Sequence, residues 1–336
     1  MPRRLLVTGA GGYIGSITSH LLLENGFDIV ALDNFTTGYK KPLELLQEKF
    51  AKSRVSIYEK STTEDLSKVF ENEKDIIGCL HFAASLSVND SMANPLEYFK
   101  NNFEGTRNLL ENLLKFNVKN IVFSSTCATF GNADYLPLDE VHPQNPVSVY
   151  GESKVMVEKM IKWLGELKGL KYVILRYFNV CGALEDGSLG DAKKPSPHLM
   201  QNAVRGALGI EPFKLTYGEV DTPDKSPIRD YVDVRDLASA HLRAIHYLFE
   251  GKDSNDFNLG TGEGNSVLEI IKVVEKVTGK EIELTKGETR KGDTAKVFAS
   301  TKKAKEVLGW EATKSLEDSV RSLVTWYNLH PDGWGG

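Results

Sequence analysis

A glycine-rich turn close to the start of the chain places the strongest constraint on the fold. Residues 8–15 read ThrGlyAlaGlyGlyTyrIleGly, directly after the apolar run 5–7 and ahead of a segment with helical period. Glycines at positions 9, 12 and 15 permit a tight turn, a close approach of the backbone to a pyrophosphate, and tight packing of the helix on the strand. The helix N-terminus then offers N–H groups to phosphates. The turn predicts a dinucleotide site.

Short apolar runs alternate with helical segments through the first half of the chain. Strands are expected at 5–7, 28–32, 55–57, 76–80, 120–123 and 172–175, and helices at Ile14–Asn25, Pro95–Lys115 and Val149–Lys168. This alternation predicts an α/β fold built on a doubly wound parallel sheet of the Rossmann type. A flavodoxin-like or phosphate-loop fold would show the same alternation, so the motifs must decide.

The pattern changes after about residue 180. Segments 182–197 and 218–228 have loop composition, and helices are expected at roughly 197–208, 234–249, 266–278 and 315–328. We therefore predict a dinucleotide-binding Rossmann domain over 1–180, with a return segment at 229–262, and a smaller C-terminal α/β lobe for the substrate over 181–336.

Charge and cysteine usage exclude several classes of partner. The 336 residues carry 41 Lys and Arg against 46 Asp and Glu, a formal net charge of −5 without basic clusters, which disfavours nucleic acid and anionic membranes as partners. No apolar run approaches the ~20 residues of a membrane span. Cys79, Cys127 and Cys181 lack metal-ligand spacing and lie in apolar stretches. We expect no metal site, buried free thiols and a cytoplasmic location.

Asp33 ends the second predicted strand, in the run AlaLeuAspAsnPhe. A carboxylate at this position binds ribose hydroxyls and repels a 2′-phosphate. Since no Arg follows it directly, NAD is favoured over NADP as the cofactor.

Tyr150 and Lys154 lie four residues apart in a predicted helix, within SerValTyrGlyGluSerLys (148–154). This spacing places both side chains on one helical face. A phenol with a pKa of ~10 is a poor base at neutral pH, and a nearby ammonium favours the phenolate. We expect Lys154 to lower the pKa of Tyr150 and make it a proton acceptor. The spacing alone is more typical of an amphipathic surface helix, so the other motifs carry the interpretation.

The run SerSerThrCysAlaThrPheGly (124–131) ends another predicted strand, where ligands bind in open parallel sheets. Together with Tyr150 and Lys154 it makes the chain resemble the extended short-chain dehydrogenases/reductases, and within them the UDP-glucose (UDP-galactose) 4-epimerases. The resemblance runs from residue 8 to 310 and includes HisPheAlaAla (81–84), AsnAsn (101–102), ArgTyrPheAsnVal (176–180), ArgAspTyrValAspValArgAspLeuAla (229–238), AsnLeuGlyThrGly (258–262), ArgLysGlyAsp (290–293) and LeuGlyTrp (308–310).

The resemblance implies reversible epimerisation at C4 of a UDP-hexose through a 4-keto intermediate, with NAD retained throughout. It implies Tyr150 as the base, Thr126 as the catalytic hydroxyl and Lys154 as the residue that holds the nicotinamide ribose. The implied cofactor-binding residues are Gly9, Gly12, Tyr13, Ile14, Gly15, Asp33, Asn34, Phe82, Ala83, Ala84, Asn101, Ser124, Tyr150, Lys154 and Tyr177. The implied UDP-sugar-binding residues are Thr126, Tyr150, Asn179, His198, Leu199, Arg229, Arg290, Asp293 and Val297.

Two arginines from distant segments suit the diphosphate, because paired guanidinium groups neutralise it well. The resemblance also implies a homodimer that pairs the helices near 95–115 and 149–168. The apolar residues Met156, Met160 and Ile161 suit such an interface and a sheet-facing core equally.

The sequence departs from the pattern of these epimerases at four places. Residues 59–61 are GluLysSer where relatives often have Glu-Gly-Asp, His198 stands where Asn is frequent, and Asp233 stands where His is common. Val297 aligns with a gate that is a bulky Tyr in some epimerases. A small residue leaves room beside C2 of the sugar, so UDP-N-acetylhexosamines form a second substrate hypothesis; the alternative is that Val297 is an ordinary core residue.

Rival enzymes share the fold. Sugar 4,6-dehydratases and UDP-glucuronate decarboxylases generally carry an acidic residue after the catalytic hydroxyl, whereas Cys127 and Ala128 follow Thr126 here. A C4 epimerase of a UDP-pentose or UDP-uronic acid, or another nucleotide-sugar oxidoreductase, remains an alternative. An NAD-binding regulator without catalysis is disfavoured because the Tyr-x-x-x-Lys pair is retained.

Overall fold

The computed structural model describes residues 3–287 and 295–335. The chain forms two compact units. The first comprises Met1–Gly131, Pro143–Arg176 and Ala238–Phe257, and the second comprises Asn132–His142, Tyr177–Leu237 and Asn258–Gly336. The predicted ranges were 1–180 and 229–262 for the first unit. In the structure the first unit excludes 132–142, its main part ends at Arg176, and its return segment is Ala238–Phe257.

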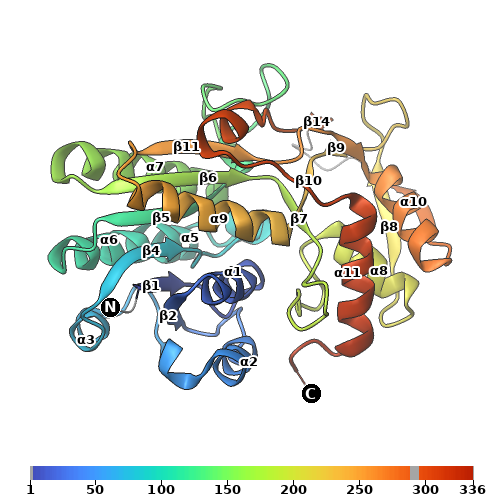
Figure 1. Cartoon of the computed structure of the whole chain (residues 1–336). Helices are drawn as coiled ribbons and strands as arrows, with labels where there is room; N and C mark the ends of the chain where they lie inside the picture. Colours follow the sequence, from blue (N-terminus) through green and yellow to red (C-terminus); the bar gives the residue numbers. More distant parts are fainter. Residues whose placement is uncertain (1–2, 288–294, 336) are drawn as a thin grey trace. The chain divides into compact units, whose positions relative to one another are not determined.

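A seven-stranded sheet in the order β11-β6-β5-β4-β1-β2-β3 forms the centre of the first unit (Figure 1). Its strands are β1 (Arg3–Thr8), β2 (Phe27–Asp33), β3 (Val55–Glu59), β4 (Ile76–His81), β5 (Asn120–Thr126), β6 (Lys171–Tyr177) and β11 (Asn255–Leu259). The pairs β3–β2, β2–β1, β1–β4 and β4–β5 are parallel. The predicted doubly wound Rossmann sheet is confirmed.

Helices cover both faces of this sheet (Figure 1). The α-helices of this unit include α1 (Tyr13–Glu24), α2 (Lys41–Phe50), α3 (Ser67–Asn72), α4 (Val88–Ala93), α6 (Gly105–Lys115), α7 (Val149–Lys168) and the part of α9 (Val234–Phe249) from Ala238 onward. Leu109 of α6 and Val157 and Ile161 of α7 pack with alternate strand residues in one buried apolar cluster. α9 covers the opposite face, where a Cβ added at Gly78 of β4 would meet the Ile245 side chain at 3.0 Å.

The helix predicted over Pro95–Lys115 is interrupted. It consists of α5 (Pro95–Tyr98), a π-helical turn over Phe99–Glu104, and α6. Within the turn, the carboxamide of Asn102 accepts the Ser85 N–H at 2.8 Å and donates to the Ser85 carbonyl at 3.0 Å. A π-helical turn changes the direction of side chains relative to an ideal α-helix, and the periodicity of apolar residues did not reveal it.

In its described residues, the second unit combines small sheets with the α-helices given below, the start of α9 and a π-helical turn at Ala304–Leu308. Its strands are β7 (Asn179–Cys181), β8 (Lys214–Gly218), β9 (Ile228–Arg229), β10 (Tyr231–Asp233), β12 (Asn265–Ser266), β13 (Glu283–Gly287) and β14 (Lys296–Val297). They form the sheets β10-β7, β12-β9-β14 and β13-β8. Helices α8 (Leu199–Ala207), α10 (Val267–Thr278) and α11 (Leu316–Leu329) contact one another beside them. Serine side chains cap α10 and α11, each in a capping box.

Candidate active site

The sheet of the first unit reverses its order between β1 and β4. From β1 the chain proceeds outward to β2 and β3, and then returns to place β4 on the other side of β1. In open α/β sheets ligands bind at the carboxyl ends of the strands at such a switch point. The segments that leave β1 and β4 there are the glycine turn and the predicted motif 81–84.

The backbone is closely packed at Gly9 and Gly15, as expected of a nucleotide-binding turn. A Cβ on Gly9 would lie 2.6 Å from the Ala83 N atom, and a Cβ on Gly15 would lie 2.2 Å from the Gly9 carbonyl oxygen. Helix α1 starts at Tyr13 without a side-chain cap and without an acidic residue in its first turn. An uncapped helix N-terminus after a glycine turn suits an anionic phosphate. These features fit the pyrophosphate of a dinucleotide.

Asp33 is almost fully buried where β2 ends, and its carboxylate accepts the N–H groups of Gly11 at 2.9 Å and Phe35 at 2.8 Å. The two bonds fix the carboxylate beside the glycine turn. A carboxylate has about four acceptor sites, so capacity remains for ribose hydroxyls. Asn34 next to it is exposed and accepts the Thr36 N–H at 3.1 Å.

The residues that follow β4 are joined to the glycine turn and to the π-helical turn. Phe82 donates its N–H to the Thr8 carbonyl at 3.0 Å, and Ala83 and Ala84 are half-buried beyond it. Asn101 donates to the Ser85 hydroxyl at 3.1 Å. Hydrogen bonds therefore connect the segment that contains Phe82, Ala83 and Ala84 to the glycine turn on one side and to Asn101 on the other.

Thr126, at the end of β5, forms a hydrogen bond with the Tyr150 phenol, near the start of α7. The hydroxyl and the phenol are therefore in contact, as the predicted catalytic set requires. Burial raises the pKa of Tyr150 above its usual value of 10, and the Thr126 hydrogen bond opposes this only in part. The direction is opposite to the one we expected from the Tyr-x-x-x-Lys spacing.

Lys154 explains why the expected direction is wrong. Its side chain is 3% exposed, and its ammonium donates to the Ser124 carbonyl at 2.8 Å and lies 4.8 Å from the centre of the Phe123 ring. Burial lowers the pKa of Lys154 to about 7, while Glu158 raises it. An amine that is only partly charged at neutral pH exerts little pull on a phenol, so burial decides the pKa of Tyr150.

Two predicted substrate residues, Arg229 and Val297, are register partners in the second unit. Parallel pairing of β14 with β9 sets Val297 opposite Arg229, and both side chains are half-buried. The buried carboxylate of Asp230 holds this region by accepting the N–H groups of Thr261 at 2.8 Å and Ala299 at 3.2 Å. A guanidinium and the predicted gate residue are thus fixed side by side.

The remaining predicted residues of the second unit lie at strand and helix ends. Tyr177 is buried at the end of β6, and Asn179 opens β7 with its N–H on the Asp230 carbonyl at 2.9 Å. His198 precedes Leu199, the first residue of α8, and burial lowers the pKa of this histidine while Asp191 opposes the shift. Arg290 and Asp293 lie outside the described residues.

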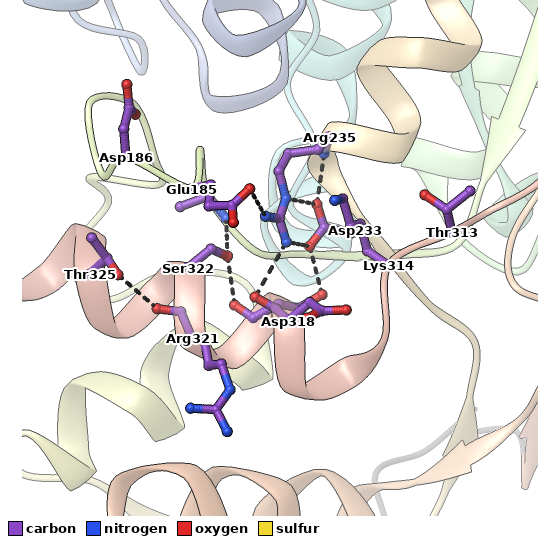
Figure 2. Close-up of polar contacts among 12 residues, drawn as sticks. Glu185, Asp186, Asp233, Arg235, Thr313, Lys314, Asp318, Arg321, Ser322 and Thr325 are labelled. Atoms are coloured by element: carbon purple, nitrogen blue, oxygen red, sulfur yellow. Dashed lines mark hydrogen bonds and ion pairs between the residues drawn. The ribbon is translucent and has the colours of Figure 1, made fainter.

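Asp233, the residue that replaces a common His, forms an ion pair with Arg235 (Figure 2). Its two carboxylate oxygens accept Nε and Nη2 of Arg235 at 2.8 Å each, and the Ser319 hydroxyl donates to it at 2.7 Å. A Cβ on Gly182 would lie 2.4 Å from this carboxylate. Asp233 and Arg235 therefore tie the start of α9 to α11, where Arg235 also donates to the Asp318 carbonyl at 3.3 Å (Figure 2).

Three buried residues around the predicted catalytic pair were not predicted from the sequence. Asn102 donates to Ser153 on α7 at 3.1 Å, and Ser125 and Glu158 join β5 to the same helix. The signal for Glu158 was its position one turn after Lys154. The thiols differ from the prediction at one position, since Cys79 and Cys181 are buried but Cys127 is partly exposed.

Residues 5–260 match the model of the NAD dependent epimerase/dehydratase family. The chain is also 42% identical to UDP-glucose 4-epimerase of Lacticaseibacillus casei, over 98% of both chains. The chain belongs to the NAD-dependent epimerase/dehydratase family. The resemblance predicted from the motifs is confirmed.

Solved structures of epimerases match this family member over nearly its whole length. UDP-glucose 4-epimerase from Bifidobacterium longum, in complex with NAD+ and UDP, has a TM-score of 0.92 and 35% identity, covering 98% of this chain and 100% of that one. The UDP-Glc/GlcNAc 4-epimerase of Campylobacter jejuni has a TM-score of 0.84 and 34% identity, covering 97% and 99%. Among the described residues of the epimerase-family chain, no helix has the length and apolar character to cross a membrane.

Proposed function

We propose that the protein catalyses the reversible interconversion of UDP-galactose and UDP-glucose by epimerisation at C4, with NAD retained through the cycle. The observation that carries the proposal is the set formed by Thr126, Tyr150 and Lys154, which joins the end of β5 to α7 in a chain of this family. The alternative of a UDP-pentose or UDP-uronic acid substrate uses the same set and differs only in the sugar.

In the proposed reaction, Tyr150 removes the proton of the sugar 4-hydroxyl, and its hydrogen bond to Thr126 orients the phenol. Lys154 is held in place by the Ser124 carbonyl and keeps a proton close to the reacting oxygen. After the 4-keto sugar turns over, Tyr150 returns the proton. Binding of UDP, remote from C4, retains the sugar while the hexose rotates. Asn179, Arg229 and His198 supply that binding in the second unit, together with Arg290 and Asp293.

NAD, when bound, supplies the acceptor and donor of the C4 hydride and a cationic ring whose charge favours a phenolate. The residues that would hold it fit its parts. Gly9, Gly12 and Gly15 leave room for the pyrophosphate, and the N-terminus of α1 at Tyr13 and Ile14 suits its charge. Asp33 would take the ribose hydroxyls, which favours NAD over NADP.

UDP-N-acetylhexosamines are the second candidate substrates. Val297 beside Arg229 is the specific observation in favour, because a valine occupies far less space than the tyrosine found at this gate in some epimerases. The structural relative from Campylobacter jejuni bears the name UDP-Glc/GlcNAc 4-epimerase. Acceptance of both sugar types by this chain is therefore part of the proposal.

We further propose a homodimer that pairs the helical segment 95–115, from α5 to α6, and α7 with their counterparts, and a cytoplasmic location where the thiols stay reduced. Large apolar side chains on these helices are exposed in the single chain: Leu96 is 79%, Trp163 60% and Leu167 65% exposed. Ile161, in contrast, belongs to the sheet-facing core. A second copy of the chain would cover the exposed residues.

The first experiment is incubation of purified protein with UDP-galactose and no added NAD, followed by separation of UDP-galactose from UDP-glucose. Conversion that a heat-denatured sample lacks is the expected result. Absence of conversion from protein shown to contain NAD would refute UDP-galactose as the substrate, and the N-acetylated pair would be assayed next. Equal occupancy by NADP and NAD would contradict the role of Asp33.

A further inference from the structure

Glu158 is a fully buried carboxylate on α7 that takes no part in the proposed proton transfers. It accepts hydrogen bonds from the Ser125 hydroxyl, from Nε2 of Gln144 at 2.8 Å, and from Arg176 through Nη2 at 2.7 Å and Nε at 3.0 Å. The donors come from β5, from the loop before α7 and from β6. One carboxylate thus joins three segments of the first unit.

Stability alone does not account for this arrangement. Removal of two charges from water is costly, and a well-packed apolar pair is often at least as stable as a buried ion pair. The Arg176 side chain is only 1% exposed, and its guanidinium also binds Asp256 at 2.9 Å. The position of Glu158 relative to the catalytic pair indicates what the carboxylate does.

Tyr150, Lys154 and Glu158 follow one another at intervals of four residues, so they share one face of α7. Three consecutive residues of β5 bind that face. Thr126 bonds to Tyr150, the Ser124 carbonyl accepts from Lys154 at 2.8 Å, and Ser125 donates to Glu158. The third of these bonds locks the register of the other two, because a slip of the strand along the helix would break all three.

Glu158 is also the carboxylate whose charge acts on Lys154, and it raises the pKa of that amine against the effect of burial. The other groups that face Lys154 do not replace it. The Phe123 ring is uncharged, and His81 on β4 is neutral, because burial and the adjacent amine lower its pKa to about 3. Arg176 pairs with Glu158 and also with Asp256 of β11, and Asp256 in turn pairs with Lys162.

We propose that Glu158 is a positioning residue of the epimerase reaction: it holds the end of β5 in register with Tyr150 and Lys154 and keeps a negative charge beside the amine. The inference rests on the proposed function. It assigns to Ser125, which lies between two residues of the predicted site, the role of the hydroxyl that transmits this register.

Four variants separate the two parts of the role. Glu158→Gln removes the charge, Glu158→Asp keeps the charge but withdraws the carboxylate by one methylene group, and Ser125→Ala removes the β5 bond alone. Asp256→Asn is the matched control, because it removes the other carboxylate that binds Arg176 without touching β5 or Lys154. For each we would measure kcat, KM for UDP-galactose, the pH profile of kcat, Tm and bound NAD.

Glu158→Gln is expected to lower kcat by roughly 10²-fold, the scale of an ångström-level misplacement, with KM nearly unchanged. Loss of the carboxylate lowers the pKa of Lys154 further, so the alkaline limb of its pH profile should move to lower pH. Ser125→Ala should lower kcat without moving the alkaline limb of the pH profile. Glu158→Asp should return that limb to its wild-type pH. Asp256→Asn should keep the wild-type kcat and profile.

The proposal would be overturned if the Glu158→Gln enzyme had the same kcat and pH profile as the Asp256→Asn control. A Ser125→Ala enzyme of full activity would also overturn it. If Glu158→Gln fails to fold, Glu158→Asp and Ser125→Ala still decide, since both retain the buried ion pair or its charges. Wild-type protein inactive on every UDP-sugar would instead refute the proposed function itself, a result distinguishable from an active wild type with unaffected variants.

Discussion

Replacement of Gly15 by alanine tests the nucleotide turn most directly. The added Cβ would lie 2.2 Å from the Gly9 carbonyl oxygen and 3.1 Å from the Ala10 Cα atom. Favourable contacts between such atoms need about 3.5 Å, so the turn and α1 must separate by roughly 1 Å. Both obstructing atoms belong to the backbone, and no side chain can rotate to relieve the contact.

The cost of forcing an extra carbon into a tight site is typically about 1–3 kcal/mol. If the strain falls on the NAD-bound form, in which the turn must close on the pyrophosphate, NAD binds roughly 5- to 150-fold more weakly. We expect wild-type protein to retain NAD through purification and Gly15→Ala protein to lose most of it. Activity of the variant should then depend on added NAD.

The assay is the amount of NAD released per protein on denaturation, together with activity titrated against added NAD. Gly26→Ala is the matched control. Gly26 has a φ of +83° with no atom within 4 Å of an added Cβ, so alanine there costs about 1–2 kcal/mol of backbone strain away from the turn. Equal NAD loss in both variants would show a general effect of stability. Full NAD retention in Gly15→Ala would refute the steric reasoning.

Four further predictions follow from the site. Tyr150→Phe should lower kcat by roughly 10²- to 10⁴-fold with little change in UDP-sugar affinity measured by calorimetry, and near-normal turnover would contradict its role as the base. Val297→Tyr should abolish turnover of UDP-N-acetylglucosamine and spare UDP-galactose, a selectivity that equal loss of both would disprove. Burial lowers the pKa of Lys154 from 10.5 to about 7, so between these pH values the unfolded chain binds more protons than the folded chain and stability rises with pH. Chemical denaturation should show this rise in the free energy of unfolding between pH 7 and 9, by up to about 1.4 kcal/mol per pH unit relative to Lys154→Met. Parallel plots of unfolding free energy against pH for the two proteins would exclude it. Leu96→Lys should convert the proposed dimer to a monomer in sedimentation analysis, whereas an unaltered mass would place the interface elsewhere.

The parts of the fold with strong local signals were predictable. The strand before the glycine turn, the turn itself and the helix Val149–Lys168 were all located from residue pattern, because buried parallel strands are continuous apolar runs and α7 has an ordinary helical period. The π-helical turn Phe99–Glu104 was not predictable, since its conformation depends on the hydrogen bonds of Asn102 with Ser85 and Ser153, which are distant in sequence.

The positions of the proposed catalytic residues were easier to predict from the sequence than their electrostatics. Spacing places Tyr150 and Lys154 on one face, and that inference needs only the geometry of a helix. The pKa of each depends on how deeply the surrounding β5 and α7 bury it, and this tertiary property cannot be inferred from a four-residue spacing. Glu158 was missed for the related reason that its partners Ser125 and Arg176 come from separate strands.

The electrostatics of the first unit explain why a ligand should stabilise it. Burial opposes ionisation of Tyr150 and charging of Lys154 and His81 at the same place, so the folded chain carries a cost there that apolar residues would not impose. Strongly shifted groups gathered at the carboxyl ends of adjacent parallel strands, here β4 and β5, are typical of a site adapted to its chemistry rather than to stability. A cofactor that supplies compensating charge and binds only the folded chain therefore raises stability by mass action. Release of NAD from the Gly15→Ala variant should thus lower Tm beyond the effect of the substitution, and saturating NAD should restore that part alone.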